Sequence, residues 1–289
     1  MEFLRPASWD DALAAKSAHP GAVPVAGGTD VLVDLNFDRS RPDALLDLNP
    51  VSELDDWSID GNKVTIGASL SYTRIINELG SRLPGLATAS RTVGSPQIRN
   101  RGTVGGNLGS ASPAGDTHPV LLALGATVEV ASSNASRQIP IDDFYLGVKR
   151  SALAVDELIR SVSLPLDTGP CHFAKIGTRN AMVIAVCSFS VALHTQSRLV
   201  RTGIGSAAPT PVRADSAEQF MVGELESAGL WESRDPLPES LLARFGSLVA
   251  DAASPIDDVR GSAAYRRHAL AVLGRRTLAW AWEDYRSCA

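Results

Sequence analysis

The sequence predicts a mixed α/β protein of two domains, with the boundary near residue 177. Short apolar strands alternate with helical segments as far as about residue 175, an order typical of a mixed α/β domain. Beyond residue 182, two long strands follow each other and helical segments fill the rest of the chain. The length of 289 residues is enough for two or three compact units with cores of their own.

The first 55 residues contain a strand, a turn, a helix and a second strand. Ser8 and Asp11 form a capping box that predicts a helix over residues 9–18, which the Pro20-Gly21 pair ends. The segments after it are a strand at 22–26 (AVPVA), a glycine turn at 27–30 (GGTD), a helix at 31–38 and a strand at 43–48 (DALLDL). We take residues 1–55 as a first subdomain.

Residues 56–176 continue the alternation and complete the first domain, 1–176. KVTIGA at 63–68 is β-branched and alternating, which predicts a strand, and residues 72–83 have apolar side chains at helical spacing. After a glycine-rich segment come a short helix at 118–126, a strand at 127–132 and a strand at 157–166.

Residues 177–289 form the predicted second domain. Its strands are expected at 182–193 and 199–208, and residues 230–242 read as a polar linker. The last helix begins near Ser262, and its expected apolar stripe consists of Ala269, Leu270, Leu273, Thr277 and Trp280.

Composition excludes several classes of function. A net charge of −5 argues against a general nucleic-acid or anionic-membrane surface. The chain lacks an apolar run long enough to span a membrane, and its N-terminus carries acids where a signal peptide is basic, so a cytoplasmic protein is expected. Cys171, Cys187 and Cys288 are dispersed and form no CxxC pair, so we expect no metal site in this chain.

The segment VAGGTD, 25–30, is the first candidate binding site. Glycines between a strand and a helix that starts at Thr29 allow backbone N–H groups to approach an anion, and a phosphate is the expected ligand. The alternative is a plain tight turn with Thr29 as the helix N-cap.

The segment NRGTVGGNLGSASPAGDTHP, 100–119, is the second candidate. Gly105 and Gly106 permit close backbone approach, and hydroxyl and amide groups follow them. Asp116 would repel a phosphate, so it suits a neutral donor such as a ribose hydroxyl or an adenine amino group. The pair of sites therefore indicates a nucleotide, and the alternative is a long irregular surface loop.

One further glycine motif is expected to be a decoy. GIGSAA at 203–208 satisfies the dinucleotide pattern GxGxxA, but Pro209 and Pro211 follow at once. No helix can open there to present its N-terminus to a pyrophosphate.

Four ordered motifs, AGGTD, IGA, QIRNRGTVGGNLGSASPAGD and RGSAAYRRH, resemble the FAD-binding medium subunit of the molybdenum hydroxylases, the group of xanthine dehydrogenase and carbon monoxide dehydrogenase. The resemblance covers about residues 1–285. It implies an α+β fold: a two-subdomain FAD-binding domain of the vanillyl-alcohol oxidase (PCMH) type, followed by a small C-terminal domain with a short antiparallel sheet and helices.

The same resemblance implies the site residues. The backbone from Val25 to Asp30 holds the diphosphate, the glycine-rich segment follows the ribityl and phosphate part, Gly115 and Asp116 lie close to the nucleotide, and Lys175 lies near the flavin. The full set of implied cofactor contacts is Val25, Ala26, Gly27, Gly28, Thr29, Asp30, Gly102, Thr103, Gly106, Asn107, Gly109, Ser110, Gly115, Asp116, Ile159 and Lys175. No catalytic side chain is expected.

As a function, the resemblance implies electron transfer. A molybdenum-pterin large subunit would hydroxylate the substrate, 2Fe2S clusters on a small subunit would carry the electrons, and FAD on this chain would pass them to NAD, quinone or oxygen. The dispersed cysteines disfavour the hydroxybenzoyl-CoA reductase branch, whose medium subunit holds an additional cluster.

Two rival functions remain open. One is a self-contained flavoenzyme similar to UDP-N-acetylenolpyruvylglucosamine reductase, and the other is a flavin-free scaffold. Arg260, Arg266 and Arg267 either shape the C-terminal domain or a partner surface, or are solvated charges at a helix end.

Overall fold

The computed structural model describes residues 1–166 and 169–287. Its N-terminal layer is a parallel three-stranded sheet of order β1-β3-β2, with α1 packed on β3. The Ser8 hydroxyl accepts the Asp11 N–H and starts α1 at Trp9, which confirms the predicted capping. The elements are β1 (Glu2–Leu4), α1 (Trp9–Ala18), β2 (Val23–Val25), α2 (Val31–Asn36) and β3 (Ala44–Asp47).

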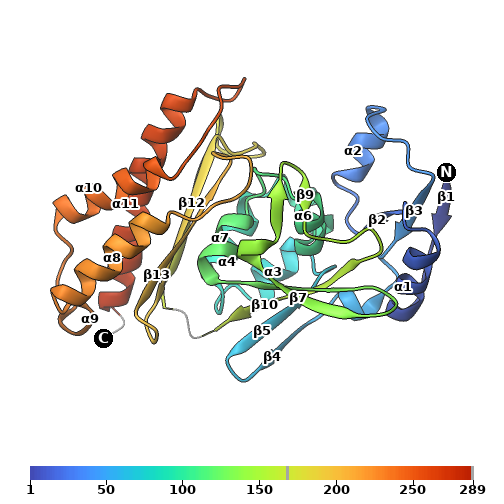
Figure 1. The fold of residues 1–289 in the computed structure, drawn as a ribbon, viewed down its shortest axis with the longest axis horizontal. Coiled ribbons are helices and arrows are strands. Elements are labelled where there is room, and N and C mark those ends of the chain that lie inside the picture. Colours follow the sequence, from blue (N-terminus) through green and yellow to red (C-terminus); the bar gives the residue numbers. More distant parts are fainter. Residues whose placement is uncertain (167–168, 288–289) are drawn as a thin grey trace.

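The middle layer is a five-stranded antiparallel sheet of order β4-β5-β10-β6-β7. Short helices lie around it, of which α6 and α7 contact β10, and a small β8–β9 hairpin follows β7 along the chain (Figure 1). The strands are β4 (Trp57–Asp60), β5 (Lys63–Gly67), β6 (Thr127–Ala131), β7 (Ser136–Pro140), β8 (Tyr145–Gly147), β9 (Arg150–Ser151) and β10 (Leu158–Pro165). The helices are η1 (Ser52–Leu54), α3 (Tyr72–Glu78), α4 (Pro84–Thr92), α5 (Pro96–Arg101), α6 (Val104–Ser110), α7 (His118–Leu124) and η2 (Ile141–Asp143).

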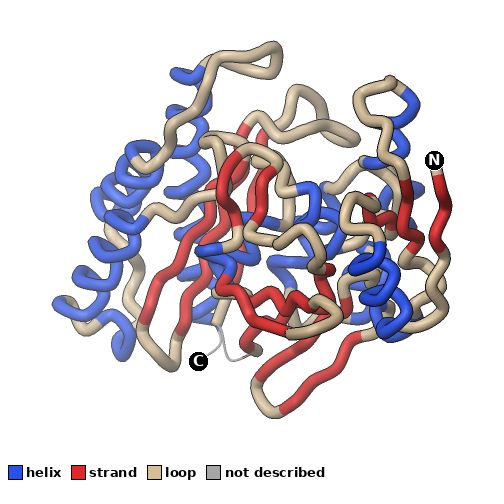
Figure 2. The backbone as a smooth tube through the Cα atoms, turned by 45° about the vertical axis from the view of Figure 1, so that its right-hand side comes forward, coloured by secondary structure: helices blue, strands red, loops and turns tan. Residues whose placement is uncertain are grey.

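The C-terminal layer is an antiparallel sheet, β11-β12-β13, that lies between two sets of helices (Figures 1 and 2). The helices α8 and α11 contact one face, and α4 and α7 contact the other. The elements are β11 (Cys171–Ile176), β12 (Cys187–His194), β13 (Leu199–Gly205), α8 (Asp215–Ser227), α9 (Leu230–Ser233), α10 (Glu239–Asp251) and α11 (Ala263–Ser287). The small antiparallel sheet followed by helices confirms the expected α+β class.

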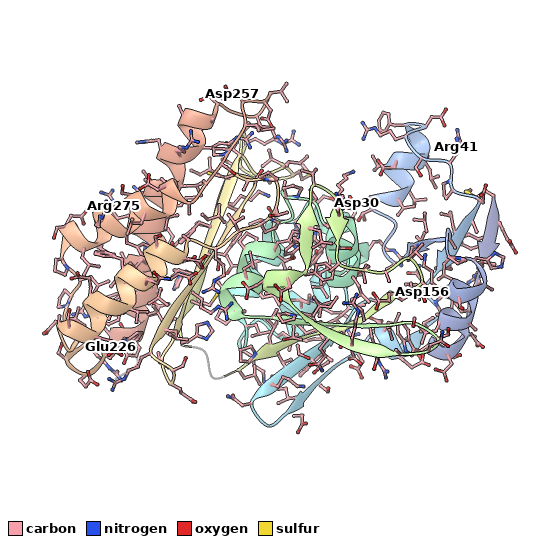
Figure 3. All side chains as sticks on the ribbon, viewed as in Figure 1. Asp30, Arg41, Asp156, Glu226, Asp257 and Arg275 are labelled. Atoms are coloured by element: carbon pink, nitrogen blue, oxygen red, sulfur yellow. The ribbon has the colours of Figure 1, made fainter. Side chains whose placement is uncertain are left out.

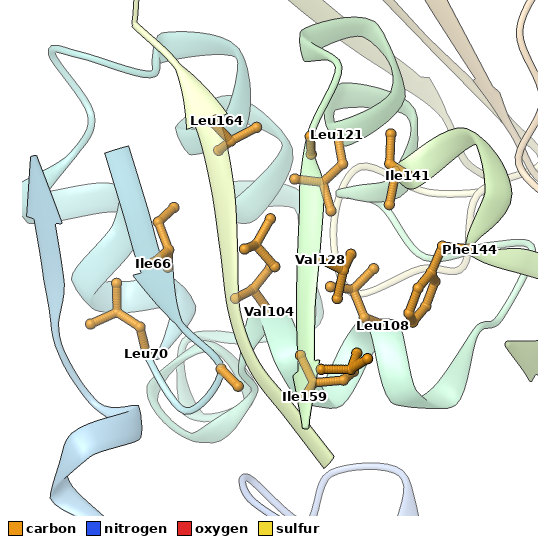
Figure 4. Packing of buried hydrophobic residues seen from close by; sticks show 14 of the residues in the cluster. Ile66, Leu70, Val104, Leu108, Leu121, Val128, Ile141, Phe144, Ile159 and Leu164 are labelled. Carbon is orange, nitrogen blue, oxygen red and sulfur yellow. The ribbon is translucent and has the colours of Figure 1, made fainter. Parts of the chain in front are cut away.

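Two hydrophobic cores meet at β11. Cys171 and Phe173 on this strand belong to the first core, whereas Ala174 and Ile176 pack against the second. Figure 4 shows part of the first core, where Val128 and Leu164 from the sheet face Val104, Leu108 and Leu121 from the helices. The predicted division at residues 176 and 177 stays a prediction.

Three expectations, two of them in the C-terminal half, need correction. Trp280 is 46% exposed, and Trp282 is buried in its place, so the apolar stripe of α11 turns away from Trp280. The segment 230–242 is not a linker throughout, because α9 and the start of α10 occupy most of it and bury Leu230 and Trp231. The helix predicted at 72–83 ends at Glu78.

In the described ranges 1–166 and 169–287, no helix has the length and apolar character needed to cross a membrane. Cys288 lies outside these ranges. Within them, no three His, Cys, Asp or Glu side chains gather in a way that could hold a metal ion.

Candidate functional site

A cavity of about 500 Å³ lies where the N-terminal layer meets the middle layer. Its walls come from both glycine segments, from the end of β5, from the start of β10 and from the β8–β9 turn. Ligand sites in proteins commonly have volumes of about 300–1,000 Å³, so the cavity is of a size that suits a cofactor.

The glycines bring the walls of this cavity together. A Cβ at Gly27 would lie 2.0 Å from the carbonyl oxygen of Arg101, and a Cβ at Gly105 would lie 2.6 Å from the carbonyl oxygen of Ala68. Both glycines therefore allow two stretches of protein backbone to touch. Gly109 differs, because a Cβ there would meet no atom within 4 Å although the residue lines the cavity. Only Gly109 among these three leaves open space for a ligand.

The backbone of 26–30 offers hydrogen-bond donors. Gly28 has a φ of +73°, a left-handed conformation that glycine adopts without strain. Among the residues that the structure describes, none accepts a hydrogen bond from the N–H groups of Gly27, Gly28 or Thr29. The helix α2 begins at Val31, as predicted for the helix at 31–38, and Asp30 is its N-cap, so the helix does not start at Thr29 as expected for the phosphate site.

The polar side chains of the second glycine segment are bonded within the protein. Thr103 is the N-cap of α6, and its hydroxyl accepts the Gly106 N–H at 2.9 Å. The side-chain amide oxygen of Asn107 accepts a hydrogen bond from the Thr117 hydroxyl at 2.8 Å. The Ser110 hydroxyl donates to Asp30 at 2.6 Å, and this bond joins the two glycine segments (Figure 3 labels Asp30). The segment thus forms an ordered wall of the cavity that contains the helix α6, and it is not an irregular surface loop.

Asp116 and Lys175 form a buried ion pair. Their oxygen and nitrogen lie 2.6 Å apart, and each side chain is only 8% exposed. Lys175 also donates to the carbonyl oxygen of Thr92, whose hydroxyl donates to Asp116. Burial raises the pKa of the Asp116 carboxyl, and the Lys175 ammonium opposes that rise. The second carboxylate oxygen, Oδ1, is buried without a partner among the described residues.

This contact changes one expectation. Asp116 cannot serve the nucleotide end of an extended FAD while Lys175 serves the flavin end, because the two side chains touch. Val93, the residue after Thr92, lines the cavity, so the pair lies directly behind its wall.

Most of the predicted site residues line this cavity, namely Ala26, Gly27, Gly28, Thr29, Asp30, Gly102, Thr103, Gly106, Asn107, Gly109, Ser110 and Ile159. The others, Val25, Gly115, Asp116 and Lys175, do not line it. A second cavity of about 690 Å³ near the start of β11 contains none of the predicted residues.

Sequence reasoning missed several residues of the cavity wall. The Ser69 hydroxyl is buried at the wall and has no partner in the part of the chain that the structure describes. Tyr72 is buried there as well, and Lys149 reaches the wall from the β8–β9 turn. Nothing local marks Tyr72 or Lys149, which come to the wall through the packing of distant segments, whereas Ser69 directly follows the IGA motif.

The two other motifs have structural roles. GIGSAA lies in β13 and the turn after it, and a Cβ at Gly203 would lie 2.0 Å from the carbonyl oxygen of Pro119, so this glycine serves packing, in keeping with a decoy. Arg266 is only 3% exposed and bonds the Ser206 carbonyl oxygen and Asp258. It therefore shapes the C-terminal domain, whereas Arg267 is exposed.

Comparisons with known proteins cover both halves of the chain. Residues 1–167 match the model of the FAD binding domain in molybdopterin dehydrogenase, and residues 172–281 match that of the CO dehydrogenase flavoprotein C-terminal domain. The chain is 32% identical to the nicotine 6-hydroxylase medium subunit of Paenarthrobacter nicotinovorans, over 96% of each chain. It is 30% identical to the glyceraldehyde dehydrogenase medium chain of Sulfolobus acidocaldarius, over 94% of this chain and 95% of the relative.

A solved structure agrees with these matches. The carbon monoxide dehydrogenase of Hydrogenophaga pseudoflava that lacks the Mo-pyranopterin moiety superimposes with a TM-score of 0.88 at 26% identity, over 98% of each chain.

Proposed function

The chain belongs to the family of FAD-binding medium subunits of the molybdopterin dehydrogenases, and from this premise we propose that it is the electron-transfer subunit of a multi-subunit molybdenum hydroxylase. In this proposal it receives electrons from 2Fe2S clusters on a small subunit and passes them to NAD, a quinone or oxygen. FAD supplies a centre that accepts electrons singly and releases them in pairs. The observation that carries the proposal is the cavity built between the two glycine segments.

The residues around the cavity fit FAD. Free backbone N–H groups at Gly27, Gly28 and Thr29 suit the diphosphate. The unpartnered Ser69 hydroxyl suits a ribityl hydroxyl, because a buried hydroxyl without a partner is costly and a bound polyol supplies that partner. The open face at Gly109 leaves room for the chain between them.

We assign Asp116 and Lys175 together to the flavin end of the site. A carboxylate next to the diphosphate would repel it, and the family resemblance places Lys175 near the flavin. Neither side chain lines the cavity, so in this assignment the pair supports the wall from behind, through the bond from Lys175 to the carbonyl oxygen of Thr92, next to the wall residue Val93. No side chain of this chain is assigned an acid or base role.

The partners in this proposal are a molybdenum-pterin large subunit and a 2Fe2S small subunit. The medium-subunit names of the relatives support it, and so does the match of both halves to models of this family. The self-contained flavoenzyme considered from the sequence is not favoured by any contact in the cavity. We also retain the cytoplasmic location and the domain boundary at residue 177 as proposals.

Purification of the tagged chain from its native cell tests the proposal. We expect stoichiometric FAD, molybdenum and two co-purifying subunits, with the flavin reduced only when those subunits and their substrate are present. Bound FAD with substrate turnover by the chain alone contradicts the proposal. Cell fractionation of the same strain tests the location.

A further inference from the structure

The proposed FAD cavity has more negative than positive side chains in its wall, and the glycine segments add no cationic side chain to it. The charged residues that line it are three carboxylates, Asp30, Asp34 and Glu157, and one cation, Lys149. The diphosphate of FAD adds two negative charges. Backbone N–H groups stabilise these charges only in part, so an uncompensated Asp30 or Asp34 would oppose binding.

Two of the three carboxylates already have partners. Glu157 accepts both arms of Arg137, at 2.7 and 2.8 Å, and also the Ala154 N–H. Asp30 accepts the Ser110 hydroxyl at 2.6 Å. Asp34 is held loosely, since its oxygens lie 3.7 Å from Arg39 and 4.0 Å from the Lys149 ammonium. Lys149 forms no shorter contact with any carboxylate that the structure describes, so its ammonium is free to exchange partners.

The backbone fixes Lys149 at the junction of the two glycine segments. Its N–H donates to the carbonyl oxygen of Ala111, the residue directly after α6. Its ammonium faces Asp34, one turn into α2 beyond Asp30. Lys149 thus lies beside the point where the Asp30–Ser110 bond joins the segments.

The conformation of Lys149 is unusual. Its φ is +53°, in the left-handed region that a non-glycine residue adopts at a cost. Such strain persists where the surrounding structure imposes it, and it is concentrated at ligand sites. The side chain is 65% exposed, so neither hydrophobic burial nor a structural ion pair accounts for a lysine at this position.

We propose that Lys149 binds the diphosphate of FAD, and that it leaves Asp34 when the cofactor enters. The proposal rests on the proposed function, because it names the cation that completes the same FAD site. Asp34 then has two effects on the empty site: it holds the lysine away from the phosphate, and it repels the phosphate directly.

The test compares FAD with riboflavin, which has no phosphate, on the flavin-stripped full-length chain. Binding is measured by titration calorimetry for wild type, Lys149→Ala, Lys149→Arg and Asp34→Asn. Arg150→Ala is the matched control, since Arg150 is an exposed cation on the same hairpin that does not line the cavity. Thermal unfolding of each stripped variant reports whether the fold is retained.

We expect Lys149→Ala to weaken FAD binding about tenfold, the effect of losing one charge-assisted contact, and to leave riboflavin binding unchanged. The dissociation constant for FAD should stay within about twofold of the wild-type value in Lys149→Arg and in Arg150→Ala. Asp34→Asn should bind FAD more tightly than wild type. The difference between wild type and Lys149→Ala should shrink as salt is raised.

Three results would overturn the proposal in distinguishable ways. An equal loss of FAD affinity in Lys149→Ala and Arg150→Ala would show that any positive charge on this hairpin favours binding, without a specific contact from Lys149. Equal loss of FAD and riboflavin in Lys149→Ala would show a structural role. A wild-type chain that takes up no FAD would overturn the proposed function together with this inference.

Discussion

The buried pair of Asp116 and Lys175 determines how the protein behind the cavity wall responds to mutation. Each side chain is 8% exposed, and the pair is 2.6 Å apart, so neither charge has water as an alternative partner. A buried ion pair is poor evidence of net stability, but removal of one member leaves the other charge buried and uncompensated. From the sequence, Asp116 appears as a ligand contact alone. The structure adds a folding role, and mutations there should affect both properties.

A double-mutant cycle on the apo chain checks this coupling. Asp116→Asn and Lys175→Met should each lower the free energy of unfolding by about 3 kcal/mol, since each leaves one buried charge alone. The double variant should lose less free energy of unfolding than the two single variants lose together. Urea unfolding of all four proteins measures this coupling energy. Additive losses, with a coupling below about 0.5 kcal/mol, would contradict a direct pair.

His118 gives the folded chain a specific pH dependence. The ring is fully buried and hydrogen-bonded to the Tyr145 hydroxyl, and burial lowers the pKa of His118 from 6.5 to about 3. Below about pH 6.5 the unfolded chain takes up a proton that the folded chain refuses, so stability is lost as the pH falls through this window. At about pH 5 the loss amounts to about 2 kcal/mol.

Urea unfolding at about pH 7 and about pH 5 checks this linkage. Wild type should lose about 2 kcal/mol more between these values than His118→Gln, whatever the stability of the variant at neutral pH. The exposed His268 provides the control, and His268→Gln should behave as wild type does. An identical pH response in His118→Gln and wild type would exclude a buried neutral ring.

At the scale of elements, local signals predict α1 but not α6. Ser8 and Asp11 determine where α1 begins through contacts three residues apart, which a sequence displays directly. The helix α6 contains Gly105, Gly106 and Gly109, and glycine disfavours a helix by about 1 kcal/mol per residue. It forms because Gly105 packs on the backbone of Ala68, 37 positions upstream, where tertiary contact overrides propensity.

The glycines of the two segments should therefore respond differently to alanine. Gly27→Ala places a Cβ 2.0 Å from the carbonyl oxygen of Arg101, and we expect about 1–3 kcal/mol of lost stability. Gly109→Ala meets no atom within 4 Å, and we expect α6 to gain up to about 1 kcal/mol. Its methyl group enters the cavity, however, so FAD binding should weaken although stability rises.

Thermal unfolding of the stripped variants and FAD titration measure the two effects separately. Gly109→Ala with unchanged FAD affinity would mean that the cofactor does not pass this face of α6. If Gly27→Ala has wild-type stability, the backbone at Arg101 can move away from residue 27 without cost. That result would contradict the close packing of the two segments in the structure.

At the scale of the molecule, the arrangement depends on contacts between distant positions. Thr65 on β5 bonds Ser163 on β10 at 3.2 Å, 98 positions apart, and Asp116 finds Lys175 across 59 positions. The hydrophobic pattern predicts many of the strands, but pairing partners depend on the whole core and leave no local trace. The glycine motifs and the family resemblance named most of the residues that line the cavity, whereas Lys149 is recognised as a wall residue only in the assembled structure.

The two halves of the molecule meet at α7. This helix contacts β12 and β13 of the C-terminal sheet, and Gly203 on β13 lies directly against the backbone of Pro119. Beside this contact, Arg201 and Arg213 reach Asp142 of η2, at 2.7 and 3.7 Å. A glycine at 203 is therefore a requirement of the interface between halves, because its missing Cβ sets how closely the sheet approaches the helix.

Substitution of this glycine should lower the stability of the whole chain. In Gly203→Ala the Cβ would lie 2.0 Å from the Pro119 carbonyl oxygen, so the halves must separate, and we expect a loss of about 2 kcal/mol, or roughly 4–8 °C in Tm. Gly223→Ala is the matched control within α8, where a Cβ meets no atom within 4 Å and helix propensity raises stability by up to about 1 kcal/mol. Differential scanning calorimetry should show opposite shifts, with a broader transition for Gly203→Ala because the two cores no longer unfold together. If both variants instead raise Tm, the α7–β13 contact does not couple the halves.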